Sequence, residues 1–398
     1  MTGMLAGIRV LDLTTVLMGP FATQILGDLG ADVVRIEGVG ADVFRDLPPS
    51  RHPGMAGFQL NLHRNKRSVA LDLKQPAAIT ALLRLVETAD VFVHNMRPKA
   101  IGRLGLDYAS LKKRNLAIVY CGAYGFSREG PYGEKAAYDD AIQAASGLAG
   151  LFAEADGAPR YVPSVICDKV AGMTVAYAIL AALLHRERGG GGQEIEVPMF
   201  EANVAFNLIE HLGPFAFEPP LGDFGWKRAM SKNRKPYRTA DGYACLLPYS
   251  DENWRDFFGF IGQAELATDT RFATYEGRTQ NVDALYAVVE RAALRHTTAE
   301  WMEFCDRVSI PAMPVMNPKR AWDDPHLRAT GFLATADHPT EGRYKTIGSP
   351  ARFLSTPAEL RRHAPRQGEH TAEILAEAGM SEADIDVLIR SGAARSAT

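Results

Sequence analysis

The sequence has few cysteines, and they form no pattern typical of a disulfide framework or a metal site. Its 398 residues include only four, Cys121, Cys167, Cys245 and Cys305. These lie far apart, with no C-x-x-C pair and no histidine spacing typical of zinc ligands. The pattern therefore predicts reduced thiols in a cytoplasmic protein and no bound metal.

The sequence also lacks a strong net charge, a signal segment and a long apolar run. The net charge is −3, which provides no field for nucleic acid or an anionic membrane surface. The N-terminal stretch "MTGMLAGIRVLDL" has no basic region followed by an apolar segment, so it is not typical of a signal peptide. The longest charge-free run, from Val170 to Leu184, is shorter than a membrane span requires. We therefore expect no nucleic-acid or membrane partner.

Strand-like and helix-like segments alternate through the first half of the chain. The stretch "IRVLDLTT" reads as a buried strand, "GPFATQILGDLG" as a helix with Pro20 in its first turn and Gly30 at its end, and "ADVVRIE" as a second strand. Further strands are predicted in "SVALDL", "DVFVHN", "LAIVYCGAYG" and "GQEIEVPM". Strands separated by helices favour parallel pairing, so the fold class is α/β with a Rossmann-like parallel sheet.

The composition and the predicted structure of the chain change twice in its second half. Residues 214–240 are rich in proline, glycine and basic residues and are predicted to form a linker. Apolar residues at helical spacing follow in "DENWRDFFGFIG", "NVDALYAVVERAALRH" and "TAEWMEFCDRVS". From about residue 335 strand-like and amphipathic segments return, ending in "EHTAEILAEAG" and "SEADIDVLIRSG".

Two glycine patterns argue against a phosphate-binding loop. The first strand–helix turn, "TTVLMGP", lacks the G-x-G-x-x-G of dinucleotide-binding folds, although Glu37 ends the second strand where a ribose-binding acid would lie. The run "RGGGG" follows a helix, where the dipole disfavours an anion, so its glycines are predicted to end that helix. The basic residues between 227 and 238 are either a solvated face or a site for a polyanionic ligand.

Asp168 stands at the head of the apolar run and has two interpretations. As a helix N-cap it would accept amide hydrogen bonds, a contribution of about 1 kcal/mol. The run behind it is apolar nearly all round and is predicted to be buried. A carboxylate at such a helix terminus would be held ionised with little water around it, which suits a nucleophile. Cys167 is a rival nucleophile, but no histidine lies near it in the sequence.

Six segments in order resemble the class III coenzyme A transferases of the CaiB/BaiF type, over roughly residues 5–390. They are "LAGIRVLDLTTVLMGPFATQILGDLGADVVRIE", "NKRSVALDLK", "VFVHNMRPKAIGRLGLDY", "GPYGEKAAYDDAIQAASGL", "CDKVAGMTVAYAILAALLHRERGGGGQEIEVPMFEA" and "GEHTAEIL". The resemblance implies a large α/β domain of residues 1–225 and 331–398, and a smaller, mostly helical α+β domain of residues 226–330. It also implies an interlocked homodimer.

The resemblance implies a CoA transferase with Asp168 as its catalytic aspartate, which forms acyl anhydride and CoA thioester intermediates. The substrates would be an acyl-CoA and a small carboxylic acid, with CoA as substrate rather than a tightly bound cofactor. Tyr138, Asp139 and Leu17 match positions at the acyl site. Residues matching CoA contacts are Leu71, Lys74, Asn95, Met96, Arg103 and Met199.

Three departures from the family bear on the substrate. The racemase branch has histidine where Tyr138 stands, and tyrosine is a poor base at neutral pH. The formyl-CoA:oxalate branch has glutamine at Leu17 and a glycine-rich loop that "WKRAMSKNRKPYRTADG" lacks, while Gly38 replaces a basic CoA contact. The first prediction is therefore CoA transfer between an acyl-CoA and a carboxylic acid. The alternatives are an α-methylacyl-CoA racemase and CoA migration within one dicarboxylate; a non-catalytic acyl-CoA binding protein is a further one.

Overall fold

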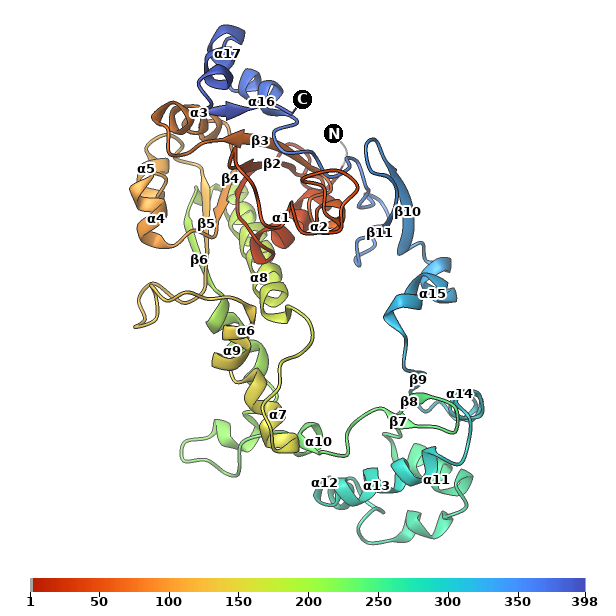
Figure 1. The fold of residues 1–398 in the computed structure, drawn as a ribbon. Helices are drawn as coiled ribbons and strands as arrows, with labels where there is room; N and C mark the ends of the chain where they lie inside the picture. Colours follow the sequence, from red (N-terminus) through yellow and green to blue (C-terminus); the bar gives the residue numbers. More distant parts are fainter. Residues whose placement is uncertain (1–2, 398) are drawn as a thin grey trace. The chain divides into compact units, whose positions relative to one another are not determined.

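The structure is a computed structural model that describes residues 3–397 (Figure 1). Contacts within the chain define two compact units. The larger unit contains residues 3–146, 162–206 and 322–397, and the smaller contains residues 147–161 and 207–321. The smaller unit thus includes residues 147–161 and 207–225, which the sequence assigned to the large domain. Residues 322–330, which the sequence assigned to the small domain, belong to the larger unit.

A seven-stranded sheet forms the centre of the larger unit, in the order β12-β3-β2-β1-β4-β5-β6. Its six main strands are parallel, and only β12 runs antiparallel, beside β3. The strands are β1 (Arg9–Leu13), β2 (Asp32–Glu37), β3 (Lys66–Leu71), β4 (Val91–His94), β5 (Val119–Tyr124), β6 (Glu194–Pro198) and β12 (Ala394–Arg395). Every residue of β3, β4 and β5 is buried, as expected for a parallel sheet covered on both faces. The predicted α/β fold is confirmed.

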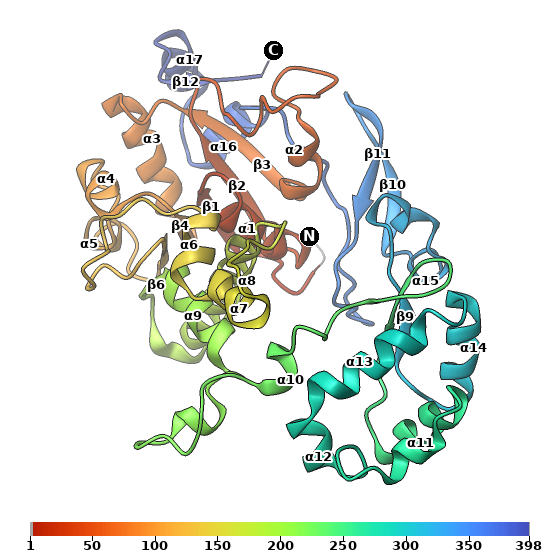
Figure 2. The same ribbon diagram turned by 60° about the horizontal axis from the view of Figure 1, so that its bottom comes forward.

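Helices connect the strands of the sheet. Those of the larger unit are α1 (Met18–Asp28), α2 (Gly57–Leu62), α3 (Pro76–Val86), α4 (Pro98–Arg103), α5 (Tyr108–Lys112), α6 (Asp139–Ala145), α8 (Ile166–His185), α15 (Pro325–Ala329), α16 (Thr371–Glu377) and α17 (Glu382–Arg390), and α9 (Met199–Leu208) begins in it. Helices α1 and α8 pack against each other, with α8 against β5 and β6 and α1 against β1 and β2 (Figure 2). Leucines of α3, α16 and α17 join the strands in the main core.

Helix α8 was predicted to be buried all round, and that prediction is wrong for one face. Met173, Tyr177 and Leu184 are exposed along it, whereas Val175 and Ile179 are fully buried. The helix and the turn that follows it, Ile166–Gly190, are also long enough and apolar enough to cross a membrane. The sequence had suggested a run too short for that, because only Val170–Leu184 is free of charge. Over half of the most apolar 18-residue window of Ile166–Gly190 is buried in the protein, as in the core helix of a globular protein. Gly189 ends it with a φ of +89°, as the glycine run predicted.

The smaller unit is a helical cluster with one small sheet. Its elements are α7 (Leu148–Asp156), α10 (Lys227–Met230), β7 (Tyr237–Arg238), β8 (Tyr243–Leu246), α11 (Asp251–Phe260), α12 (Tyr275–Gln280), α13 (Val282–Ala293), α14 (Thr298–Arg307) and β9 (Ala312–Pro314). Capping boxes begin α11 at Ser250 and α14 at Thr297. Aromatic side chains fill its core, with Trp301 and Phe257 stacked at 5.7 Å.

The prediction that residues 214–240 form a linker is wrong for the second half of that segment. Helix α10 and strand β7 lie within it, and β7 pairs with β8. Two of its basic residues have partners: Arg228 donates to the Tyr286 hydroxyl at 2.8 Å and Lys235 pairs with Glu290 at 2.8 Å. The sequence did not reveal α10 and β7 because they are only four and two residues long. The proline and glycine residues around them are typical of a linker.

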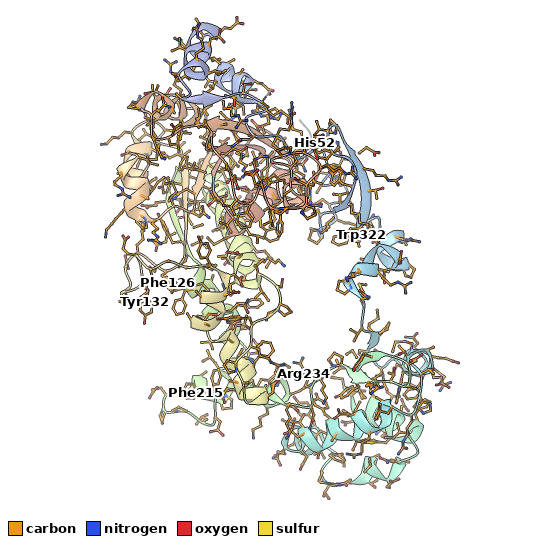
Figure 3. All side chains as sticks on the ribbon, in the orientation of Figure 1. His52, Phe126, Tyr132, Phe215, Arg234 and Trp322 are labelled. Atoms are coloured by element: carbon orange, nitrogen blue, oxygen red, sulfur yellow. The ribbon has the colours of Figure 1, made fainter. Side chains whose placement is uncertain are left out.

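After the smaller unit the chain returns to the larger one through an antiparallel hairpin. Strands β10 (Leu333–His338) and β11 (Gly342–Ile347) form it, and Figure 3 labels Trp322 at the start of this segment. The Trp322 indole donates to the Ala334 carbonyl at 3.3 Å, and Lys345 lies 4.6 Å from its ring. The predicted return to α/β structure at the C-terminus is confirmed by α16 and by β12, which pack on β3.

Candidate active site

A pocket of about 200 Å³ opens at the carboxyl ends of the parallel strands in the larger unit. Ligand sites of α/β sheets lie at this edge, because the loops that follow the strands converge there. The pocket brings together four residues that the sequence singled out: Asp168, Tyr138, Asn95 and Met199. Its lining is completed by Thr15, Val16, Met18, Arg97, Pro98, Ala123, Tyr124, Gly125, Gly133, Lys135, Ala136 and Ala137.

Asp168 lies inside helix α8 rather than at its cap. The helix begins at Ile166, and the residue before it, Val165, makes no side-chain capping bond. The prediction that Asp168 caps the helix is therefore wrong, because the chain enters the helix two residues earlier. Among residues 3–397, no side chain or amide donates a hydrogen bond to the Asp168 carboxylate, although only 8% of the residue is exposed. The carboxylate is left to face the pocket.

The electrostatic setting of Asp168 raises its pKa. Burial and the negative charge of Asp139 raise the pKa of this carboxyl to about 6. The sequence predicted that helix amides would hold the group ionised, and in the structure no amide does so. At neutral pH most of the protein still carries Asp168 as a carboxylate, one that is more basic and less solvated than an ordinary aspartate.

Cys167 is a poor candidate for a nucleophile. Cys167 is fully buried. Burial together with the charges of Asp139 and Asp168 raises the pKa of its thiol to about 12. A thiol with that pKa is protonated at neutral pH, and the thiolate is the reactive form. None of the four cysteines is in a disulfide.

A strained turn after β1 forms one wall of the pocket. Val16 has a φ of +68°, which is rare for a β-branched residue and costs about 1–3 kcal/mol. Asn95, which directly follows the neighbouring strand β4, holds the turn. Its Oδ1 accepts from the Thr15 amide at 3.0 Å and its Nδ2 donates to the Thr15 carbonyl at 2.8 Å. Leu17 follows as the half-buried residue before α1.

The same turn is anchored from within the sheet. Asp12 on β1 accepts from the Thr14 amide at 3.0 Å and pairs with fully buried Lys66 at 3.1 Å. Lys66 also donates to the Pro20 carbonyl at 2.9 Å. The buried ion pair thus fixes both ends of the segment between β1 and the first turn of α1.

Helix α8 approaches that segment closely because it carries a glycine there. A Cβ at Gly172 would stand 2.7 Å from the carbonyl oxygen of Met18. Since Met18 and Asp168 both line the pocket, this contact sets the width of the pocket between α1 and α8.

The loop after β5 provides the opposite wall. The ring of Phe126 packs on that of Tyr132 at 5.5 Å, and both are labelled in Figure 3. It also packs on Phe200 at 5.4 Å. The Lys135 amide donates to the Tyr132 carbonyl at 2.8 Å. This loop leads to Tyr138, which is 70% exposed and immediately precedes α6. Asp139, the first residue of α6, is buried and lies behind Asp168 rather than in the pocket lining.

The remaining predicted CoA contacts lie outside the pocket lining. Leu71 is fully buried in the main core, so its side chain packs within the fold. Lys74 lies exposed in the loop after β3, Arg103 is exposed at the end of α4, and the Met96 amide donates to His94 at 3.2 Å. Leu71 ends β3, and Lys74 and Met96 lie in the loops after β3 and β4, at the carboxyl edge along which a ligand could extend from the pocket.

Sequence reasoning missed several pocket residues. Arg97 and Lys135 bring two cations to the lining, and Tyr124 brings a phenol. Arg97 and Lys135 lay within matched segments, so their basic charge was an available signal. Val16 gave no such signal in the sequence, because its backbone conformation is set by the contacts of Asn95 and Lys66 with the residues around it. Within residues 3–397, no group of three histidine, cysteine or acidic side chains could hold a metal ion.

The fold and the pocket define an α/β enzyme with a buried carboxylate at the carboxyl edge of its sheet. CoA-transferase family III matches residues 5–371 of the chain. The protein belongs to this family, whose members transfer coenzyme A between acyl donors and carboxylic acid acceptors, and it is a CoA transferase.

Three relatives show the range of the family. The chain is 31% identical to a succinate–glutarate CoA-transferase of Agrobacterium fabrum, covering 94% of this chain and 95% of that one. It is 33% identical to the probable fatty acyl-CoA transferase Rv3272 of Mycobacterium tuberculosis, covering 94% and 97%. It is 31% identical to a formyl-CoA:oxalate CoA-transferase of Shigella sonnei, covering 96% and 97%.

A solved structure is similar over the same length. The crystal structure of an aspartate-to-alanine mutant of Rv3272 superposes with a TM-score of 0.81 at 30% identity, covering 93% of this chain and 98% of that one. The fold is therefore shared across the family while the named substrates of the relatives differ.

Proposed function

We propose that Asp168 is the nucleophile that carries acyl groups and CoA in this CoA transferase. The observation that carries the proposal is its carboxylate, which is buried, faces the pocket and has no donor among the described residues. A carboxylate in that setting is ready to attack a carbonyl carbon, because little solvation has to be removed first.

The reaction divides into four exchanges. An Asp168 oxygen attacks the acyl-CoA carbonyl carbon, the C–S bond breaks, and a mixed anhydride and CoA thiolate result. The thiolate attacks the aspartyl carbonyl carbon and releases the donor acid, leaving an aspartyl-CoA thioester. The acceptor carboxylate attacks that thioester carbon, forming a second anhydride and thiolate. The thiolate then attacks the acceptor acyl carbon, giving the new acyl-CoA and free Asp168, with no net proton change.

The pocket suits these four exchanges because the buried surroundings of Asp168 limit the access of water to the intermediates. Both the anhydride and the thioester hydrolyse if water reaches them. Asp168 rests on the buried face of α8, with fully buried Cys167 and Ala171 beside it. Tyr138 and Leu17 would surround the acyl group, with Asp139 behind Asp168 at the same site. Asn95, Met96, Arg103, Met199, Leu71 and Lys74 would contact CoA along the carboxyl edge.

We further propose a small dicarboxylic acid as the acceptor. Arg97 and Lys135 line the same pocket as Asp168, and cations of these types bind carboxylates. One carboxylate of the acceptor would react while the other pairs with a cation. The succinate–glutarate enzyme among the relatives supports this class, whereas Leu17 offers no polar group to oxalate. Intramolecular migration of CoA on such an acid would use the same exchanges.

The protein is also proposed to act as an interlocked homodimer in the cytoplasm. The support is unpartnered apolar surface: Tyr177 on α8 is 62% exposed and Phe206 on α9 is 54% exposed. In the smaller unit, Ile209 is 80% exposed and Leu221 is 72% exposed. Apolar surfaces of this kind mark protein–protein contacts. Four unpaired thiols fit a reducing compartment.

The first prediction concerns Asp168 itself. Asp168→Asn removes the nucleophile while keeping the volume of the side chain, so we expect CoA transfer to fall by at least about 10³-fold. The measurement is mass spectrometry of CoA products from one acyl-CoA offered to a panel of mono- and dicarboxylic acids. Retained transfer in Asp168→Asn would contradict the proposal. Exchange of the substrate α-proton with deuterium and no CoA movement would instead indicate a racemase.

A further inference from the structure

Helix α8 receives its cap from a different helix. Asp139 on α6 accepts a hydrogen bond from the Asp168 amide through Oδ1 at 3.0 Å. That amide lies in the first turn of α8, where amides have no partner within their own helix. Asp139 thus performs the capping role that the sequence suggested for Asp168, and the Asp168 side chain is released for the pocket.

Gln143 completes this arrangement one turn along α6. Its Nε2 donates to Asp139 Oδ2 at 2.6 Å, and its Oε1 accepts from the Val162 amide at 2.9 Å. Val162 lies in the segment that leads into α8. Gln143 is fully buried, so these bonds are shielded from water. Both Asp139 oxygens are therefore engaged by uncharged donors, and the carboxylate stays in place behind Asp168.

We infer that Asp139 and Gln143 form a positioning pair that holds the backbone of Asp168 and keeps a fixed negative charge behind it. The inference rests on the proposed role of Asp168 as the nucleophile. The pair has two separable effects. The hydrogen bonds from Gln143 and to the Asp168 amide fix where the nucleophile stands, and the charge of Asp139 makes that nucleophile more basic.

The charge effect is specific to Asp139 among the groups around Asp168. The other ionisable side chains that line the pocket are Lys135 and Tyr138 before α6, Arg97 on the loop after β4, and Tyr124 on β5. On α8 itself, Cys167 is a protonated thiol at neutral pH, since its pKa is raised to about 12. Burial and Asp139 are the two causes that raise the pKa of Asp168. Removing the Asp139 charge should therefore lower that pKa, while burial keeps it above the ordinary value.

The test compares two neutralised carboxylates that are adjacent in the sequence. Asp139→Asn is isosteric and keeps an oxygen that can accept from the Asp168 amide, but its amide nitrogen cannot accept from Gln143, so the bond to Gln143 is lost together with the charge. Asp140→Asn makes the same charge change on the next residue, which is exposed. The readout is the rate of acyl-enzyme formation from acyl-CoA against pH. We expect the midpoint of the acid limb to lie near pH 6 in the wild type and in Asp140→Asn, and about one pH unit lower in Asp139→Asn.

A third variant separates position from charge. Gln143→Met keeps the volume and the Asp139 charge but removes the hydrogen bonds that Gln143 makes to Asp139 and to the backbone of Val162 and Ser164. We expect it to lower the rate of acyl-enzyme formation about tenfold or more at every pH, without moving the acid limb downward. A purely structural role for the pair would lower the amplitude in Asp139→Asn and Gln143→Met, leave Asp140→Asn like the wild type, and leave the midpoint unchanged in all three.

A substrate-free readout keeps this test independent of the proposed function. Carbodiimides label protonated carboxyls, so peptide mass spectrometry of Asp168 labelling against pH reports the same titration. Equal labelling midpoints for Asp139→Asn and Asp140→Asn would overturn the inference. An absence of acyl-enzyme with a shifted labelling midpoint would instead overturn the nucleophilic role and leave the positioning pair standing.

Discussion

At the scale of single residues, the site depends on separating two tasks that one aspartate could perform. A capping carboxylate is held by amides and is solvated or hydrogen-bonded, which makes it a weak nucleophile. Asp168 has no donor among the described residues and has a raised pKa, while Asp139 accepts the amide bond. The cost of this separation is a buried carboxylate without a partner.

That cost predicts that removing the charge of Asp168, the proposed nucleophile, stabilises the fold at neutral pH. The folded pKa of about 6 lies above the ordinary value of 3.8, so the native state holds its proton more tightly than the unfolded chain. Stability contributed by this group is thus present at low pH and is lost as pH rises from about 4 through about 6. Asp168→Asn should gain on the order of 2 kcal/mol at pH 7. Urea unfolding at pH 7 and at pH 4 measures it, with Asp140→Asn as control; an equal gain at both pH values would contradict the account.

At the scale of elements, the pocket is set by close approaches between helices and loops. Gly172 allows α8 to approach the first turn of α1, and the strained turn at Val16 is held by Asn95 from the neighbouring strand. These contacts join segments far apart in the sequence. They explain why an isolated segment carries little trace of the site.

Two glycine substitutions should therefore have opposite signs. Glycine inside a helix is usually less favourable than alanine by about 0.5–1 kcal/mol. Gly150 in α7 has open space around it, so Gly150→Ala should stabilise by about that amount. Gly172→Ala would place a Cβ 2.7 Å from the Met18 carbonyl, so it should destabilise the fold and reduce transfer. Thermal unfolding and transfer rates of the two variants check this; stabilisation by both would show that α1 and α8 do not constrain the pocket.

How far the elements could be predicted depended on the period of their apolar residues. Every strand of the parallel sheet and most of the longer helices carry a clear pattern and were predicted, whereas the nine-residue helix α7 was not. The short elements α10 and β7 were missed because two to four residues cannot show a period. The start of α8 was misplaced because Asp168 is a good cap residue and Val165, the actual N-cap, is not. The bond that the Asp168 amide donates to the distant Asp139 decides between them.

At the scale of the whole molecule, unpartnered apolar surface predicts assembly. The stripe of Met173, Tyr177 and Leu184 on α8 belongs to the helix that carries Asp168, so a second subunit against it would also shield the site from water. Tyr177→Asp places a charge in that stripe and should reduce the dimer recovered in light scattering coupled to size exclusion. Val43→Asp, on an exposed apolar residue elsewhere, should leave the mass at two chains. A monomeric wild type would contradict the proposed dimer.

The most direct test of the nucleophilic role follows one oxygen atom. With an acceptor acid labelled with oxygen-18 in its carboxylate, the four exchanges leave one acceptor oxygen on Asp168 at the end of each turnover. Peptide mass spectrometry after turnover should find oxygen-18 in the Asp168 carboxylate, and acyl-CoA omitted from the reaction should abolish the label. CoA transfer that proceeds with no label at Asp168, or with the label on another residue, would contradict the account.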